Sequence, residues 1–394
     1  MVEGLPLEDI ALCLNAGSSS LKFALFRVTA QTEDALAAGA IEHLGSASAR
    51  ATLTVGGQRI ERACAHADAA DALNAAFQLL EEQGLPAATL VGHRVVHGGR
   101  THLYPTRVDS QLLESLRALI PLAPLHLPGG ILGIEAALAR LPKVPHVACF
   151  DTSFHAGLPE YAARFALPSR LYDEGVRRYG FHGLSYEYVL SRLGDPPPAR
   201  LIVAHLGNGA SLAAIKDGKS IDTTMGFTPG GGIPMGTRSG DLDPGLVLYL
   251  LREKGYTPST LEDLLERKSG LLGVAGSADM RELVPRSADD PLARLAIVIM
   301  GYAVRKTIGA YMAVLGGLDL LVFTGGIGEH TPAIREEACR GLSAFGVALD
   351  SAKNAHDMPQ IHADASACRI LVMTTDEDRM IARHTRALVR EGSR

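Results

Sequence analysis

The sequence predicts an α/β fold made of two domains that share one internal pattern. The chain has 394 residues, more than one ordinary hydrophobic core organises, so its length favours two domains. Strand-like apolar runs alternate with stretches of helical periodicity, an alternation typical of α/β folds. A hairpin pattern near the N-terminus also recurs in the second half of the chain, as a duplicated domain would produce.

The repeat consists of two strand-turn-strand patterns with small or polar residues at the turn. They occupy residues 10–28 and 201–215, and aligning Ser20 with Ser211 superposes them. Because the match is short, chance remains an alternative to duplication as the explanation of the repeat. The repeat alone places the domain boundary near Asp151.

The spacing of apolar residues, together with residues typical of helix and strand ends, predicts the remaining elements. The helix at 291–315, for example, begins after Asp290, a capping residue, with proline at its first position. Helices are predicted at residues 68–83, 109–119, 243–254, 291–315, 332–344 and 377–390, and strands that end at Phe150, Ala204, Phe323 and Met373.

The composition excludes several classes of protein. Apolar residues make up 47% and charged residues 21% of the chain, which excludes intrinsic disorder and a collagen-like repeat. A net charge of −5 without blocks of like charge predicts no nucleic-acid partner. No export signal and no long uninterrupted apolar run is apparent, so we expect neither export nor a membrane span. The five cysteines lack metal-site spacing and predict free thiols in a reducing cytoplasm.

Three turns rich in glycine or serine each follow an apolar strand, at residues 15–20, 207–211 and 325–328. Small residues let backbone N–H groups approach an anion closely, and the serine hydroxyls add donors. One such turn is most often an ordinary tight turn, but three together favour a nucleotide cleft. Gly218-Lys219-Ser220 resembles the end of a P-loop, yet Ala213 stands where the motif needs glycine, so a surface turn is predicted there.

Arginine, histidine and acidic residues accompany these turns. Arg94 and Arg238 lie in glycine-rich segments with little apolar surface nearby, so a phosphate or carboxylate partner is expected, with a structural salt bridge as the alternative. Asp151 and Glu377 could hold Mg²⁺, whose preferred ligands are oxygens. Taken alone, Glu377 is also typical of an acid at a helix N-terminus.

Seven segments of this sequence resemble motifs of the acetate kinase family. They occur in the family's order and cover essentially the whole chain. They are residues 15–22, 92–99, 151–155, 179–183, 205–211, 236–244 and 323–329. The resemblance implies the actin-like ATPase fold, with two duplicated ribonuclease H-like domains flanking a nucleotide cleft. The domains would span residues 1–150, with helix 378–394 packing back on them, and residues 151–377, which would bind the nucleotide and form the dimer interface.

The same resemblance implies reversible phosphorylation of acetate to acetyl phosphate by Mg·ATP, in a cytoplasmic homodimer. It also implies which residues form the site. Catalysis would fall to Asp151, Arg94, Arg238, His182 and Asn208, and the acetate methyl group would meet Val96, Leu125, Phe181 and Pro229 beside Arg94. Mg²⁺, or Mn²⁺ in its place, would bind near Asn15 and Glu377. The nucleotide would contact Ser18, Ser20, Lys22, His205, Leu206, Gly207, Asn208, Gly209, Gly326, Ile327, Gly328 and His330.

Simple chemistry agrees with this reaction. A carboxylic acid is already ionised at neutral pH, so the acceptor needs no general base. Bringing it to an anionic phosphoryl group needs fixed positive charge, which two arginines supply. A propionate or other short-chain acyl kinase is the sibling alternative. A sugar kinase, which would need a carboxylate base, and a non-catalytic actin-like protein are alternatives of other classes.

Several positions depart from the family pattern. Leu127-Pro128-Gly129-Gly130 and Gly230-Gly231-Gly232 replace segments with polar side chains, Leu184 and Tyr186 replace a threonine and a histidine, and His330 replaces an asparagine. The glycines predict mobile loops, weak acetate binding and tolerance of propionate. Neutral drift in solvent-facing loops is the alternative.

Overall fold

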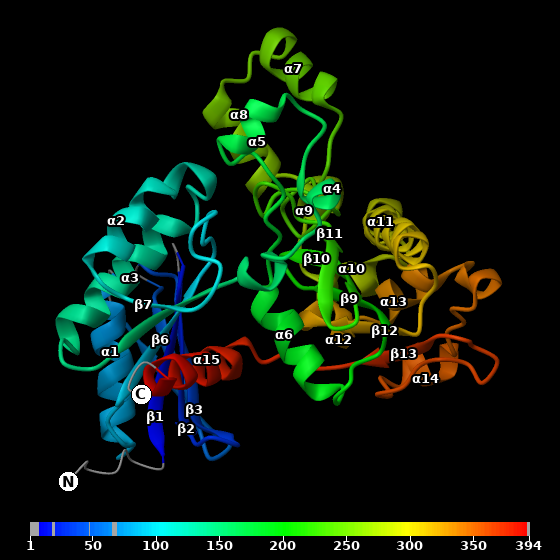
Figure 1. Ribbon diagram of the computed structural model, residues 1–394. Helices are drawn as coiled ribbons and strands as arrows, with labels where there is room; N and C mark the ends of the chain where they lie inside the picture. The colour runs from blue at the N-terminus through cyan, green and yellow to red at the C-terminus, as the bar shows by residue number, and fades with distance from the viewer. Residues whose placement is uncertain (1–7, 18–19, 47, 65–68, 392–394) are drawn as a thin grey trace. The chain divides into compact units, whose positions relative to one another are not determined.

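A computed structural model describes residues 8–17, 20–46, 48–64 and 69–391, which form two compact units. The first unit contains Met1–Ser153 and Asp376–Arg394, and the second contains Phe154–Thr375. Figure 1 shows the chain in order, with the final helix in red beside the blue strands of the first unit. The chain therefore leaves its first unit once and returns to it at the end.

The first unit is built on an eight-stranded sheet in the order β5-β4-β3-β2-β1-β6-β8-β7. Strand β1 pairs antiparallel with β2, and β1, β6 and β8 are parallel neighbours. The strands are β1 Asp9–Ala16, β2 Ser20–Val28, β3 Glu33–Glu42, β4 Arg50–Val55, β5 Gln58–Ala63, β6 Leu90–Val95, β7 Thr106–Arg107 and β8 His146–Phe150.

Helices cover this sheet. The helices are α1 Ala69–Glu82, α2 Ser110–Ala118, α3 Leu127–Arg140 and α15 Glu377–Glu391. Helices α1 and α3 pack against each other and share a hydrophobic core with β1 and β2. On β6, Val91 belongs to that core, whereas a Cβ at Gly92 would collide with Ile381 and Thr385 of α15. Since neighbouring residues of a strand face opposite sides, α15 covers the other face, at a distance that only glycine permits.

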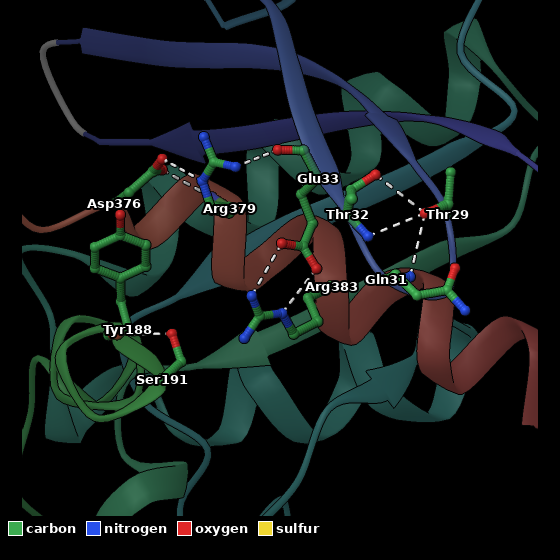
Figure 2. A network of polar contacts seen from close by, with 9 residues as sticks. All are labelled: Thr29, Gln31, Thr32, Glu33, Tyr188, Ser191, Asp376, Arg379 and Arg383. Atoms are coloured by element: carbon green, nitrogen blue, oxygen red, sulfur yellow. Dashed lines mark hydrogen bonds and ion pairs between the residues drawn. The ribbon is translucent and has the colours of Figure 1, made fainter. Parts of the chain in front are cut away.

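Ion pairs fasten the returning helix α15 to the sheet. The Arg383 guanidinium donates to both carboxylate oxygens of Glu33 at 2.8 and 2.9 Å. Arg379 pairs with Asp376 at 2.9 Å and also donates to the Glu33 carbonyl (Figure 2). At the other end of the helix, Arg386 and Arg390 pair with Asp9 of β1. These contacts fix the position of the helix whose first residue is Glu377.

The second unit has a five-stranded sheet in the order β11-β10-β9-β12-β13. Its strands are β9 Arg200–Leu206, β10 Ala210–Lys216, β11 Lys219–Thr223, β12 Leu320–Thr324 and β13 Arg369–Val372. Its helices are α4 Glu160–Ala163, α5 Ser169–Asp173, α6 Gly183–Arg192, α7 Pro244–Glu253, α8 Pro258–Arg267, α9 Gly270–Ala275, α10 Met280–Arg286, α11 Pro291–Leu315, α12 Gly325–His330, α13 Pro332–Cys339 and α14 Ser351–Ala355.

Both sheets contain the same five-stranded arrangement. In the first unit β3-β2-β1 form an antiparallel meander and β6 and β8 continue parallel to β1. In the second unit β11-β10-β9 form the meander, and β12 and β13 continue parallel to β9. The duplication that the sequence repeat predicted is therefore confirmed at the level of topology.

Three local predictions are wrong. Residues 127–130 are not a mobile loop but the first turn of α3, because Pro128 suits that position and Leu127 is buried in the core. Residues 325–328 are not an open turn but begin α12, whose first N–H, that of Gly325, donates to Glu329. The helix predicted at 332–344 ends at Cys339, since Gly341 adopts a φ of 76°.

Helix α11 is the one helix among the described residues that is long and apolar enough to cross a membrane. It packs against α9, α10, α13 and β10, and nine of its residues are buried. These contacts are those of a core helix in a globular unit.

Two buried histidines predict how the stability of the fold depends on pH. Burial lowers the pKa of His93 to about 3, with His146 opposing its charge, and lowers the pKa of His155 to about 4. The unfolded chain therefore binds protons that the folded chain does not between about pH 6.5 and 4. We expect the free energy of unfolding to fall with decreasing pH in this window, by about 1.4 kcal/mol per pH unit for each histidine. Urea denaturation at pH 7 and pH 5 measures this loss, and His155→Asn should make it smaller, whereas an equal loss in that variant would contradict the assignment.

Candidate active site

Arg94 of β6 is the centre of a polar cluster in the first unit. Its Nε and Nη2 donate to the Asp151 carboxylate at 3.1 and 2.5 Å, and its Nη1 donates to Asn15 Oδ1 at 3.3 Å. Its Nε also lies 3.4 Å from Glu377 Oε2. Asn15, Arg94 and Asp151 come from the carboxyl ends of the parallel strands β1, β6 and β8, which meet at one edge of the sheet.

Negative charge exceeds positive charge in this cluster. Burial disfavours the charged guanidinium of Arg94, but Asp151 and Glu377 more than offset this and raise its pKa. Burial, reinforced by Glu377 and Asp376, raises the pKa of Asp378 to about 7, against opposition from Lys22 and Arg94. Asp376, Glu377 and Asp378 thus gather acidic groups beside Arg94, an arrangement that a further cation would stabilise.

The donor set fits a hard divalent ion. Asn15, Asp151 and Glu377 offer only oxygen ligands, which Mg²⁺ prefers. No group of three histidine, cysteine or acidic side chains in the described residues has the geometry of a metal centre by itself. The residues therefore suit Mg²⁺ that is bound together with phosphate oxygens.

His182 is the centre of the corresponding cluster in the second unit. It precedes α6 with a φ of 59°, a left-handed conformation that is rare for a residue with a side chain and typical of functional sites. Its Nδ1 lies 2.9 Å from Ser211 Oγ, and its ring stacks on His205 at 4.1 Å between centroids. Its Nε2 and Arg238 Nη1 each lie 3.4 Å from the place that a Cβ at Gly209 would take. The imidazole and the guanidinium thus converge over the bare backbone of Gly209.

Arg238 is held in place by Glu266 of α8. Its Nε lies 3.3 Å from Glu266 Oε2, and its Nη1 donates to the Pro229 carbonyl at 3.3 Å. Thr237 Oγ1 donates to the Glu266 carbonyl at 2.8 Å, which ties the same loop to the same helix. Burial raises the pKa of Glu266 while Arg238 opposes the rise, so each charge stabilises the other.

The glycine segment 230–232 packs closely against its neighbours. A Cβ at Gly230 would collide with the Glu266 carboxylate, and one at Gly232 would lie 2.8 Å from Thr224. The Gly232 N–H donates to Asp241 Oδ1 at 2.7 Å, and Gly232 adopts a φ of 92°. Gly230 and Gly232 thus make room for neighbouring groups, and the mobility of this loop stays a prediction.

A cavity of about 790 Å³ opens beside Asn208 in the second unit. Five of the predicted nucleotide contacts line it: Gly207, Asn208, Gly326, Ile327 and His330. Sequence reasoning missed the rest of the lining, which is Ala278, Asp279, Met280, Arg281, Val284, Pro285, Thr331 and Pro332. Asp279 caps α10 and pairs with Arg281, so its sequence signal was that of an ordinary helix start.

Other predicted nucleotide contacts lie away from this cavity lining. His205 faces Ser185 at 2.8 Å from within β9, Leu206 is buried, Gly209 lies in the turn between β9 and β10, and Gly328 lies within α12. Ser20 and Lys22 begin β2 in the first unit. Ser18 lies outside the described residues.

The four predicted acyl contacts divide between the units. Val96 packs near Phe150 in the first unit, where Leu125 lies in the turn before α3. Phe181 and Pro229 are buried in the second unit. The Phe181 carbonyl lies 3.1 Å from His155 Nε2, and that of Pro229 accepts from Arg238. Two of the predicted acyl contacts thus belong to each unit.

Comparisons with known proteins point in one direction. The family model described as the acetokinase family matches residues 10–383. The chain is 46% identical to an acetate kinase of Methylocella silvestris, over 97% of this chain and 98% of the relative, and 47% identical to one of Rhodopseudomonas palustris, over 96% and 98%. A propionate kinase structure from Francisella tularensis is similar at 38% identity and a TM-score of 0.91, over 96% of this chain and 99% of that one. An acetate kinase structure from Porphyromonas gingivalis is similar at 36% identity and a TM-score of 0.87, over 97% and 100%.

The pairing of Arg238 with Glu266 predicts the effect of two substitutions. Glu266→Gln removes the charge that holds the guanidinium, and Gly230→Ala displaces the same carboxylate, so each should lower kcat/KM by about tenfold, the scale of one charged hydrogen bond. Steady-state kinetics measures both. Glu262→Gln changes an exposed carboxylate one turn earlier on α8 and is the matched control. Equal losses in all three variants would show that Glu266 has no special role.

Proposed function

Because this chain belongs to the acetokinase family, we propose that it transfers the γ-phosphoryl group of ATP to the carboxylate of acetate, giving acetyl phosphate and ADP. The observation that carries the proposal is the convergence of Arg238 and His182 over Gly209, beside Asn208 and the adjoining cavity. An anionic acceptor and an anionic phosphoryl group repel each other, and fixed donors without intervening side chains offset that repulsion. The acceptor is ionised at neutral pH, so no residue has to act as its base.

Each residue then has a task set by its contacts. Arg238, fixed by Glu266, stabilises the negative charge that builds on the transferring phosphoryl group. His182 donates a hydrogen bond from Nε2 to the same phosphoryl group. Asn208 carries its amide at the mouth of the cavity that would take the nucleoside. In the first unit Arg94, fixed by Asp151, supplies the second positive charge. The second unit is thus the nucleotide-binding one.

Asn15, Asp151 and Glu377 are the residues that would hold Mg²⁺. When bound, this ion neutralises and orients the phosphate oxygens of the nucleotide. Mn²⁺, with similar ligand preferences, would substitute. Glu377 owes its position to the ion pairs that fasten α15, so metal binding depends on a helix supplied by the end of the chain.

Acetate is the preferred acceptor in this proposal, and propionate is the alternative. A similar structure is named a propionate kinase, and a hydrophobic pocket separates the two acids by only about 1–3 kcal/mol. The helical start of α3 removes one of the two loops on which the prediction of a loose pocket rested.

We also propose that the enzyme works in the cytoplasm as a homodimer, with neither nucleic acid nor membrane as a partner. The support for a dimer is a row of exposed apolar side chains on α11, formed by Leu292, Leu295, Val298 and Tyr302. Burying such a row against a second copy removes it from water.

Trapping acyl phosphate with hydroxylamine tests the reaction. With ATP and Mg²⁺ we expect product from acetate at the highest kcat/KM, from propionate less efficiently, and none from glycerol. Arg238→Ala should lower kcat by at least about a hundredfold, which ties the signal to this site. Absence of product from every carboxylate would refute the proposed function, and equal or better use of propionate would establish the alternative.

Glu377→Ala should change the dependence on Mg²⁺ more than the affinity for acetate. We expect the Mg²⁺ concentration for half-maximal activity to rise by about tenfold or more, because an oxygen ligand is lost. The KM for acetate should change by less than about threefold. Arg383→Ala, which breaks the pair with Glu33 and leaves the carboxylates near Arg94 in place, is the control for loosening of α15. An unchanged Mg²⁺ titration in Glu377→Ala, with only a lower melting temperature, would identify Glu377 as a helix-end acid.

A further inference from the structure

Two buried hydroxyl groups connect the core of the second unit to the imidazole of His182. Tyr186 Oη lies 2.5 Å from Ser211 Oγ, and Ser211 Oγ lies 2.9 Å from His182 Nδ1. Tyr186 and Ser211 are both fully buried, with 0% exposure, whereas His182 retains 9%. Tyr186 thus adjoins the reacting histidine through one intermediary, and nothing in the proposed mechanism has used it.

The backbone fixes this alignment. His182 precedes α6, and the N–H of Tyr186, four residues later, donates to the His182 carbonyl at 3.1 Å. The first turn of α6 thus ties the two residues together, and both side chains meet Ser211 Oγ. Ser211 belongs to β10 and pairs there with His205, whose ring stacks on His182. The Tyr186 ring packs against Phe154 and His155 at 5.8 and 5.5 Å between centroids. The hydroxyl therefore points at Ser211 from a rigid base.

The relative acidity of the two hydroxyl groups sets the direction of the two hydrogen bonds. A phenol, with a typical pKa of about 10, is a stronger hydrogen-bond donor than an aliphatic hydroxyl, so Tyr186 donates to Ser211. The Ser211 proton is then available to His182 Nδ1, which accepts it as the unprotonated ring nitrogen. A neutral imidazole that accepts at Nδ1 carries its proton at Nε2.

We propose that Tyr186 is a positioning residue which, through Ser211, holds His182 as the Nε2–H tautomer that can donate to the transferring phosphoryl group. The proton then lies on the nitrogen that faces Gly209, where Arg238 also converges. Stacking on His205, itself held by Ser185 at 2.8 Å, fixes the plane of the ring. In the other tautomer Nε2 has no proton and can only accept, which repels an anionic oxygen. This inference rests on the proposed role of His182 in phosphoryl transfer.

Nitrogen NMR of enzyme labelled in histidine tests the proposal directly, because the shifts of the two ring nitrogens identify the tautomer. His182→Gln assigns the His182 signals. In the unmodified enzyme we expect neutral His182 with the proton on Nε2. In Tyr186→Phe we expect a mixture of tautomers, a kcat lowered by about tenfold and a KM for acetate changed by less than about twofold. Ser211→Ala, a small change in the same chain, should shift the tautomer at least as far.

The matched control is Tyr179→Phe, which removes a buried hydroxyl that donates to the Gly175 carbonyl at 2.8 Å in the same unit. It should lower stability but leave the His182 tautomer unchanged. A His182 tautomer that stays the same in both Tyr186→Phe and Ser211→Ala would overturn the proposal. A shifted tautomer with unaltered kcat would overturn its catalytic half and count against His182 as the donor. Failure of the unmodified enzyme to phosphorylate any carboxylate would instead refute the proposed function, with the tautomer measurement unaffected.

Discussion

Two guanidinium groups have to stay charged and largely buried, and much of the structure is arranged around that constraint. A buried unpaired charge is strongly disfavoured, so each arginine needs a carboxylate partner that leaves part of it available to an anion. Arg94 has Asp151 and Glu377, and Arg238 has Glu266. A structural salt bridge was the alternative interpretation of these arginines. Under the proposed function the two interpretations are compatible, because the salt bridge fixes the charge before the anion arrives.

The duplicated topology explains where these groups lie. In both units the polar residues of the proposed site follow the carboxyl ends of parallel strands: β1, β6 and β8 in the first, and β9 and β12 in the second. Ligands gather at this edge in open α/β sheets because the loops there converge from several strands. Asn15 lies near the end of the first hairpin strand of one unit, and Asn208 lies in the turn after the first hairpin strand of the other.

Glycine permits close packing at three positions that adjoin the proposed site or the helix that carries Glu377. Gly92 admits α15 against the sheet, Gly230 admits Glu266, and Gly209 leaves open the place where His182 and Arg238 converge. In each case the missing Cβ lets another group approach, and that group bears on the site directly or through one intermediary. A substitution at such a position would act by displacing a functional neighbour.

The sequence by itself determined the α/β class, the duplication, the family and most helix boundaries, because apolar periodicity, capping residues and long motifs are local signals. It also singled out Arg94, Arg238, His182 and Asn208. Tertiary structure alone decided that Leu127 begins a buried helix, that residues 230–232 are packed, and that Ala278 to Arg281 line the cavity. It alone joined Glu266 to Arg238 and Tyr186 to His182. A carboxylate or a tyrosine within a helix looks the same in sequence whether it faces solvent or a catalytic group, and only the packing of distant elements fixes which one it meets.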